Sequence, residues 1–237
     1  MSFLSNVTLL GASAAVTTGY STIWGLGTTA YVQLTAGVAM EVVSNSANDT
    51  AAGTGARTVK VSGVTGDYVP FVETVTLNGA TPVPLVNTSA IAINSMEVMT
   101  AGSGGTNAGR IDGRTVSGSA IKSTIRASDV PGMSHDFIFT VPAGRYAKLK
   151  RVAAYIAGPT AGFMSVVIRS YTAAGAYKTN GVMSASFDLA GFNGTLFMDY
   201  SDGIYFPEKT LIMAMGAMSA GSATLTSALG ELELYSM

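Results

Sequence analysis

The stretch Val69–Leu85, VPFVETVTLNGATPVPL, indicates the fold class more clearly than any other part of the sequence. Its first half, Phe71–Leu77, is rich in β-branched and aromatic residues and alternates in the manner of a half-buried strand. Asn78-Gly79 follows at once. Because this dipeptide accepts two successive positive φ angles, it favours a type I′ turn. We therefore predict a hairpin whose second strand returns through Thr81–Leu85.

Two prolines complicate that returning strand. Pro82 and Pro84 each lack the backbone N–H that a ladder hydrogen bond requires. A strand with such residues is tolerated at the edge of a sheet or beneath another element. We expect this segment to lie at a sheet edge or to be covered by another element.

The rest of the chain repeats the same pattern. No stretch of about twelve residues has apolar positions at helical spacing behind a capping residue. Short runs rich in Val, Ile, Thr, Tyr and Phe are instead separated by Gly, Asn and Asp. The further predicted strands are Thr28–Leu34, Val38–Val43, Thr58–Ser62, Ile91–Thr100, Ala120–Ile125, Asp136–Val141, Lys148–Ile156, Phe163–Tyr171, Val182–Leu189, Thr195–Asp199, Thr210–Ala217 and Ala223–Tyr235. The sequence therefore predicts an all-β protein.

The order of turns favours a jelly-roll-like β-sandwich with an N-terminal arm. Pro-containing turns at Val141–Gly144 and Phe206–Thr210 lead into long strands, which suits a jelly roll. We predict an arm or edge segment over residues 1–44 and a sandwich body over residues 45–237. The Gly-rich stretches Ala51–Gly55 and Ala101–Gly109 are predicted loops, and an internal boundary near residues 102–118 stays open.

The composition indicates a protein that associates with other proteins. Of the 237 residues, 48% are hydrophobic and 11% are charged, against about 25% charged in an ordinary soluble domain. The net charge is -1, and no basic block could neutralise a phosphate backbone, so nucleic acid is not an expected partner. The sequence has no apolar run of about 18 residues, so we expect no membrane span. We expect a homo-oligomer, with a trimer favoured.

Few residues suggest chemistry. His135 is the single histidine, and in an extended chain its side chain points to the face opposite to that of its neighbours Ser134 and Asp136, so the three cannot form a triad. Asp199 and Asp202 supply too few carboxylates for an EF-hand calcium loop. The Gly-rich run 102–109 lacks the lysine of a phosphate-binding loop. We expect no enzyme, and no catalytic, cofactor-binding or metal site.

Other residues suggest contacts with partners. Met213 and Met215 share a face of one predicted strand, and soft methionine surfaces serve either a core or an interface. The interface candidates are Trp24, Tyr31, Met213, Met215 and Met218. A further set of aromatic residues has two interpretations, a sugar-stacking platform or ordinary surface packing. These residues are Tyr171, Tyr177, Tyr200 and Tyr205.

Three blocks of sequence carry a resemblance to a known family. They are Ser44–Val59 (SNSANDTAAGTGARTV), Glu73–Gly79 (ETVTLNG) and Thr100–Gly109 (TAGSGGTNAG). In this order and spacing they resemble a family of virion structural proteins encoded by tailed bacteriophages. The resemblance implies membership of the phage particle. Capsid decoration proteins, head fibres and tail components all remain open.

Together these observations predict a virion protein that works by packing. The expected role is that of a capsid decoration or cement protein, which contacts the major capsid protein or other virion proteins and is assembled in the host cytoplasm. An alternative is a tail, head-fibre or adaptor component that contacts host glycans. A carbohydrate-active enzyme is a remote alternative, because its paired carboxylates would have to come from only fourteen acidic residues.

Overall fold

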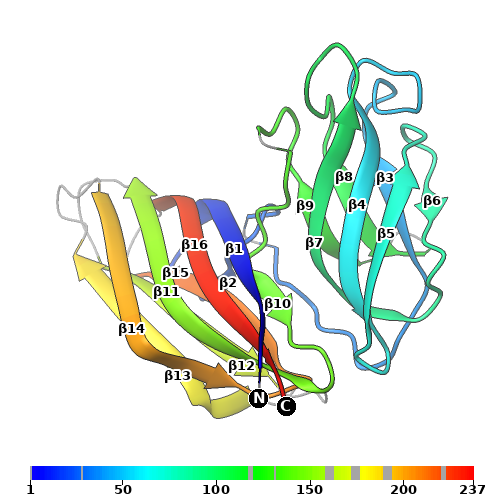
Figure 1. Cartoon of the computed structure of the whole chain (residues 1–237). Coiled ribbons are helices and arrows are strands. Elements are labelled where there is room, and N and C mark those ends of the chain that lie inside the picture. Colours follow the sequence, from blue (N-terminus) through cyan, green and yellow to red (C-terminus); the bar gives the residue numbers. More distant parts are fainter. Residues whose placement is uncertain are drawn as a thin grey trace. The chain divides into compact units, whose positions relative to one another are not determined.

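The computed structural model of the chain describes residues 2–27, 29–116, 120–130, 132–157, 163–171, 177–188, 194–219 and 223–237. These residues form strands, turns and coil without a helix, so the predicted all-β class is confirmed. It follows that no helix capable of crossing a membrane is found among them. The chain divides into two compact units (Figure 1), the first of residues Met1–Ala30 with Asp136–Met237 and the second of residues Tyr31–His135.

This division differs from the predicted one. Residues 1–30 belong to the body of the first unit and do not form a separate arm, but their long strand lies at the edge of a sheet, in agreement with the alternative of an edge segment. The reason is that β1 (Phe3–Val16) pairs along its length with β16 (Ala223–Ser236), the last strand of the chain. The suggested boundary near residues 102–118 falls inside the second unit. A pairing across more than two hundred residues leaves no signal in local periodicity.

The first unit contains two sheets. Sheet A has the order β1-β16-β11-β14, in which β11 is Arg145–Ala157 and β14 is Gly194–Phe206. Sheet B has the order β10-β15-β12-β13, with the short β2 also paired to β15. The bounds in sheet B are Ser21–Thr22 for β2, Ile138–Thr140 for β10, Phe163–Tyr171 for β12, Tyr177–Asp188 for β13 and Leu211–Met218 for β15.

Both sheets contribute to one buried core. Leu149 and Leu232 come from sheet A, and Phe139 and Ile212 come from sheet B. Phe137 lies in the same core and is fully buried. The four strand residues are apolar side chains on the inward faces of their strands, as alternation requires, and Phe137 directly precedes β10.

Two glycines make room for Phe137 against sheet A. A Cβ atom at Gly230 would lie 2.4 Å from Cζ of Phe137, and one at Gly11 would lie 2.8 Å from its Cβ. Any larger residue at these positions would therefore overlap the ring or its stem. Gly11 and Gly230 are on the neighbouring strands β1 and β16.

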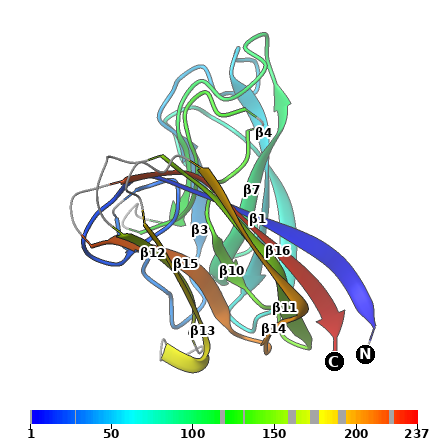
Figure 2. The ribbon, with the colours of Figure 1, turned by 90° about the vertical axis from the view of Figure 1, so that its left-hand side faces the viewer.

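The two termini meet at one end of sheet A (Figures 1 and 2). The backbone N–H of Ser2 donates to Oγ of Ser236 at 3.1 Å, and the backbone N–H of Ser236 donates to the carbonyl of Ser2 at 3.0 Å. The ladder then runs without interruption from Ser5 opposite Leu234 to Gly11 opposite Ala228. The first and last strands thus hold each other in the sheet.

The second unit also contains two sheets around a core of its own. Sheet C has the order β5-β4-β7, with bounds Pro70–Thr76, Ala56–Thr65 and Ala90–Ala101. Sheet D has the order β6-β3-β8-β9, with bounds Val83–Pro84, Met40–Ser44, Ile111–Thr115 and Ile121–Ile125. The core residues are apolar side chains from both sheets, among them Met40, Val61, Met96, Ile111 and Ile125.

The hairpin predicted from Val69–Leu85 is wrong in its second half. β5 is present, but it pairs with β4, and Val83–Pro84 pairs with β3 in the other sheet. Gly79 has a positive φ of 59°, whereas Asn78 has none, so the type I′ turn does not form. Pro84 does lie at a sheet edge, because β6 is the outermost strand of sheet D, and Pro82 directly precedes that strand. That prediction is confirmed.

Most of the other predicted strands are present with shifted ends. Phe163–Tyr171 matches β12, and Ala223–Tyr235 differs from β16 by one residue at its end. The prediction for Thr28–Leu34 is wrong for residues 29–34, which form no strand, and Thr28 lies outside the described residues. The strands β1, β2 and β8 were not predicted. β2 has only two residues, and β1 and β8 contain many small or polar residues that weaken the apolar alternation.

Candidate functional site

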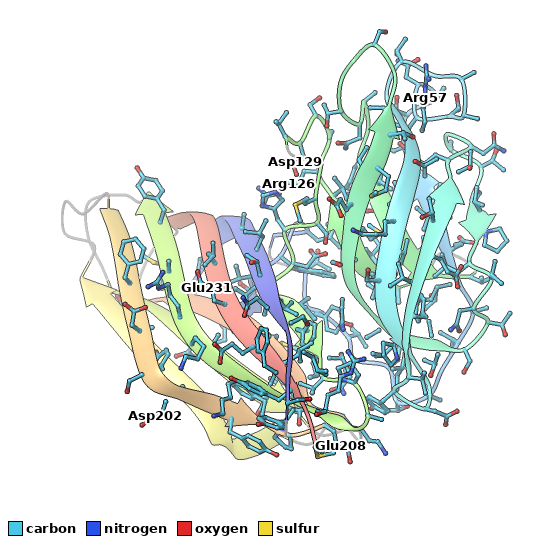
Figure 3. All side chains as sticks on the ribbon, viewed as in Figure 1. Arg57, Arg126, Asp129, Asp202, Glu208 and Glu231 are labelled. Atoms are coloured by element: carbon cyan, nitrogen blue, oxygen red, sulfur yellow. The ribbon has the colours of Figure 1, made fainter. Side chains whose placement is uncertain are left out.

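The outer face of sheet A carries a row of polar side chains that follows the strand register. Glu231 of β16 lies opposite Thr8 of β1 on one side and Arg151 of β11 on the other. Arg151 in turn lies opposite Asp199 of β14. Because directly opposed residues point to the same face, these four side chains form one row across the sheet. Glu231 is labelled on this face in Figure 3.

Arg151 connects the row. Its Nε donates to Oδ1 of Asp199 at 2.5 Å, and its Nη1 lies 3.8 Å from Oε1 of Glu231. The hydrogen bond to Asp199, followed by the charges of Asp199 and Glu231, raises the pKa of Arg151 above its ordinary value. All three side chains are exposed, so solvent screens their charges and the pairs add little to stability. Their value is to fix side-chain positions on an open surface.

A shallow hollow of about 540 Å³ follows the charged row. Its polar lining comes from all four strands of sheet A and includes Asn6, Lys150, Tyr200, Ser201 and Glu233. Amide, hydroxyl, ammonium and carboxylate groups thus face one open surface. Such a surface can exchange hydrogen bonds with a polar partner, such as a sugar or a protein loop.

Aromatic side chains cross the same face near the chain termini. Ring centroids lie 5.8 Å apart for Phe3 and Tyr235, 5.0 Å for Tyr235 and Tyr146, and 5.2 Å for Tyr146 and Tyr205. We call these four residues the aromatic row. The Nζ atom of Lys148 lies 5.5 Å from the centroid of Tyr235. Phe3 and Tyr205 are each 52% exposed, so the two ends of the row face solvent.

Sequence reasoning found only Tyr205 among the aromatic row. Tyr200 is half-buried, and its hydroxyl donates to the sulfur of Met198 at 3.5 Å. The hydroxyl of Tyr171 donates to the sulfur of Met215 at 3.7 Å. The side chain of Tyr177 lies outside the described residues. The three tyrosines that can be placed therefore do not form the sugar-stacking platform that was one of the two interpretations. The register of sheet A gives Tyr205 different aromatic neighbours.

The interface candidates are mostly core residues. Trp24 is 1% exposed, Tyr31 8%, Met213 5% and Met218 3%. Nε1 of Trp24 donates to the carbonyl of Thr29 at 2.7 Å. Side chains buried this deeply cannot contact a neighbouring protein while the chain stays folded. Met215, which is half-buried, is the one candidate for which an interface role stays a prediction.

The polar residues around His135 have separate partners. Nε2 of His135 lies 3.0 Å from Oδ2 of Asp129. Oγ of Ser134 accepts a hydrogen bond from the backbone N–H of Met96 at 3.0 Å, and Oδ1 of Asp136 accepts one from Gly25 at 3.3 Å. Each polar group therefore has a different partner. Within the described parts of the chain, no group of three or more His, Asp or Glu side chains could hold a metal ion.

A buried carboxylate in the second unit joins the three blocks of the resemblance. Asp49 is fully buried, and its oxygens accept hydrogen bonds from Oγ of Ser44 at 2.6 Å and from the backbone N–H of Ala56 at 2.7 Å. The N–H groups of Ala108 and Gly109 donate to it at 2.8 and 2.9 Å. The carbonyl of Asp49 accepts from Gly79 at 2.8 Å. Residues from all three blocks thus meet at Asp49.

Glycines allow this approach of loops. A Cβ atom at Gly55 would lie 2.1 Å from Oδ1 of Asp49, and one at Gly109 would lie 2.4 Å from Oδ1 of Asn45. The small residues of the blocks therefore have a structural explanation, which is close packing around a buried charge. Sequence reasoning assigned both Gly-rich stretches to loops but did not identify Asp49 as the residue that holds them together.

A buried lysine holds the segment that enters the second unit. Nζ of Lys122 donates to the carbonyl of Val32 at 2.6 Å and lies 5.4 Å from the ring centroid of Tyr31. Burial lowers the pKa of Lys122 from its ordinary value to about 8. The contact explains why Tyr31 is buried although the segment around it forms no strand.

Comparisons with known proteins give little further guidance. No protein-family model and no curated protein matches the chain. Among solved structures, the chain is similar to VP2 of infectious bursal disease virus in derived T=1 particles, with 10% identity and a TM-score of 0.29 over 99% of this chain and 74% of that one. A subviral particle of VP2 gives 9% identity and a TM-score of 0.26 over 99% and 77%. At such low scores the likeness carries no argument about this chain.

Proposed function

We propose that the chain is a structural protein of a tailed-phage particle, most specifically a capsid decoration protein that acts through protein–protein packing and without a catalytic step. The observation that carries the proposal is the strand order of the first unit. Numbered one to eight along the chain, β1 and β10 to β16 form sheets of order 1-8-3-6 and 2-7-4-5. This is the order of a jelly roll, an architecture common in viral capsid domains.

The second unit fits this proposal as an insertion. It occupies the connection between the first and second strands of the proposed jelly roll, since β3 to β9 lie between β1 and β10 in the chain. Insertions are tolerated at such connections because the strands on either side are held by their own sheet. The three blocks that resemble phage virion proteins all lie within this unit.

The composition supports a role in packing. With 11% charged residues, the chain has few charges to keep copies apart at high local concentration. A decoration protein stabilises a shell by repeating a modest contact many times. The relevant partners are then the major capsid protein and further copies of this chain.

Removal of the protein from particles tests the decoration role. Particles that lack the chain should release their genome at lower temperature than complete particles, and adding the purified protein back should restore the higher value. If stripped particles are equally heat-stable, the decoration role is wrong. Adsorption to cells, measured on the same stripped particles, separates this outcome from a fibre or adaptor role.

Contact with host glycans is a second candidate function, and the aromatic row favours it. Exposed tyrosine rings can stack on sugars, and the neighbouring hollow offers polar groups to sugar hydroxyls. Tyr205→Ala removes an exposed ring at the end of the row. Loss of particle adsorption with unchanged particle heat stability would support glycan contact. Tyr155→Ala, which removes a 40% exposed ring on the neighbouring strand β11 and outside the aromatic row, is the matched control.

A further inference from the structure

The first strand of the chain has an open edge unlike the other edges in the molecule. β1 is an edge strand of sheet A, and the sheet pairs it only with β16. It is fourteen residues long. Phe3, Leu4, Asn6 and Thr8 on it are exposed, whereas the end from Gly11 to Val16 is buried where its side chains are described.

Natural proteins protect sheet edges from pairing with other chains by charge, proline or short length. The described edge strands other than β1 follow this rule. β5, β7, β9, β13 and β14 each contain a charged residue, and β2, β6 and β10 have three residues or fewer. The sequence of β1, FLSNVTLLGASAAV, contains no charge and no proline. Between its register shifts, from Ser5 to Gly11, the strand therefore lacks charge, proline and bulge alike.

We infer that β1 pairs antiparallel with β1 of a second copy of this chain about a two-fold axis at Thr8. The regular part of the strand runs from Ser5 to Gly11, between two register shifts. Centring the axis on Thr8 places Thr8 opposite itself, Val7 opposite Leu9 and Asn6 opposite Leu10. All residues of the regular part, from Ser5 to Gly11, then pair with residues of the regular part of the second copy.

In this register, each face of β1 is opposed by the same face of β1 in the second copy. Leu9 belongs to the core of the first unit and Val7 packs against it, so the pair Val7–Leu9 would continue the core from one copy into the next. On the other face, Thr8 meets Thr8, a favourable cross-strand pair. Two-fold pairing places equivalent residues near one another, and a strand without charge carries no penalty for it.

The contact would join two copies of sheet A into one continuous sheet. Glu231, the nearest charge to Thr8 in the register, would lie three strand spacings, or about 14 Å, from its copy. This exceeds the Debye length of about 8 Å at physiological salt, so the two carboxylates would repel little. The result is a dimer, in place of the trimer favoured by the sequence.

Mass measurement of the purified chain tests the inference, independently of the role in a particle. Light scattering of the wild-type chain should give twice the chain mass. Thr8→Lys places two ammonium groups opposite each other and should raise the dimer dissociation constant at least about tenfold. Thr74→Lys, at an exposed position of the edge strand β5, should leave the dimer intact. A monomeric wild type, or a dimer unchanged by Thr8→Lys, would overturn the inference.

A cross-link provides a second readout that does not depend on the lysine variant folding. The chain contains no cysteine, so Thr8→Cys introduces a single thiol. Opposed residues in an antiparallel pair have Cβ atoms about 4.5–5.5 Å apart, which is close to disulfide geometry. Mild oxidation should convert Thr8→Cys to a covalent dimer and leave Thr74→Cys monomeric on a non-reducing gel. Equal cross-linking of the two variants, or none, would contradict the register.

Discussion

At the scale of single residues, Asp49 is the position on which the second unit depends most. Its carboxylate accepts four hydrogen bonds, from Ser44 on β3, from Ala56 on β4 and from the adjacent loop residues Ala108 and Gly109, and its side chain has no contact with solvent. Asp49→Asn would turn an NH₂ group toward backbone N–H donors. We expect a loss of about 3 kcal/mol in the free energy of unfolding, measured by urea denaturation. Asp67→Asn, at an exposed turn, should change it by less than about 0.5 kcal/mol.

Lys122 should make stability depend on pH in the alkaline range. Its pKa is about 8 in the folded chain and about 10.4 in an unfolded one. Between these values the unfolded state binds more protons, so the free energy of unfolding should rise with pH by roughly 1–3 kcal/mol. Below pH 8 Lys122 is protonated in both states, so the cost of burying its charge lowers the free energy of unfolding by a constant amount. Thermal unfolding between pH 7 and 10.5 should show this rise, and it should vanish in Lys122→Met. Lys60→Met, at a surface ion pair with Glu97, should keep it.

At the scale of elements, the packing of Phe137 against β16 depends on the absence of a side chain at Gly230. Gly230→Ala places a methyl group 2.4 Å from the ring, so the ring or the strand must move. We expect the midpoint of thermal unfolding to fall, with a loss of about 1–3 kcal/mol from overpacking. Gly19→Ala is the matched control, because nothing lies within 4 Å of its Cβ position. An equal effect of both substitutions would show that the gap beside Phe137 is unimportant.

For the elements, the positions of most strands could be predicted from the sequence, but the pairing of the strands could not. The alternation of apolar and polar residues correctly predicted the all-β class and most strands, because the face to which a strand residue points depends only on its position in the local sequence. Proline chemistry correctly placed Val83–Pro84 at an edge. Strand partners were missed: β5 pairs with β4, and β1 with β16. The aromatic row, which combines Phe3 with Tyr146, was missed for the same reason, since its members meet only through sheet register.

At the scale of the whole molecule, the two units should fold separately. Residues 31–135 form a continuous stretch with a hydrophobic core of their own. Expressed alone, this fragment should show a cooperative thermal transition and dispersed amide resonances. The first unit is interrupted in sequence and joins the two ends of the chain through β1 and β16. A fragment of residues 31–135 that stays unfolded would mean that its core depends on the rest of the chain.

The proposed role makes the chain a repeated shell component of the phage particle. Quantitative mass spectrometry of purified particles, with isotope-labelled peptides of this chain and of the major capsid protein, measures the ratio of the two directly. We expect a copy number comparable with that of the major capsid protein. A few copies per particle would assign the chain to a tail or fibre, and its absence from purified particles would contradict the proposed role altogether.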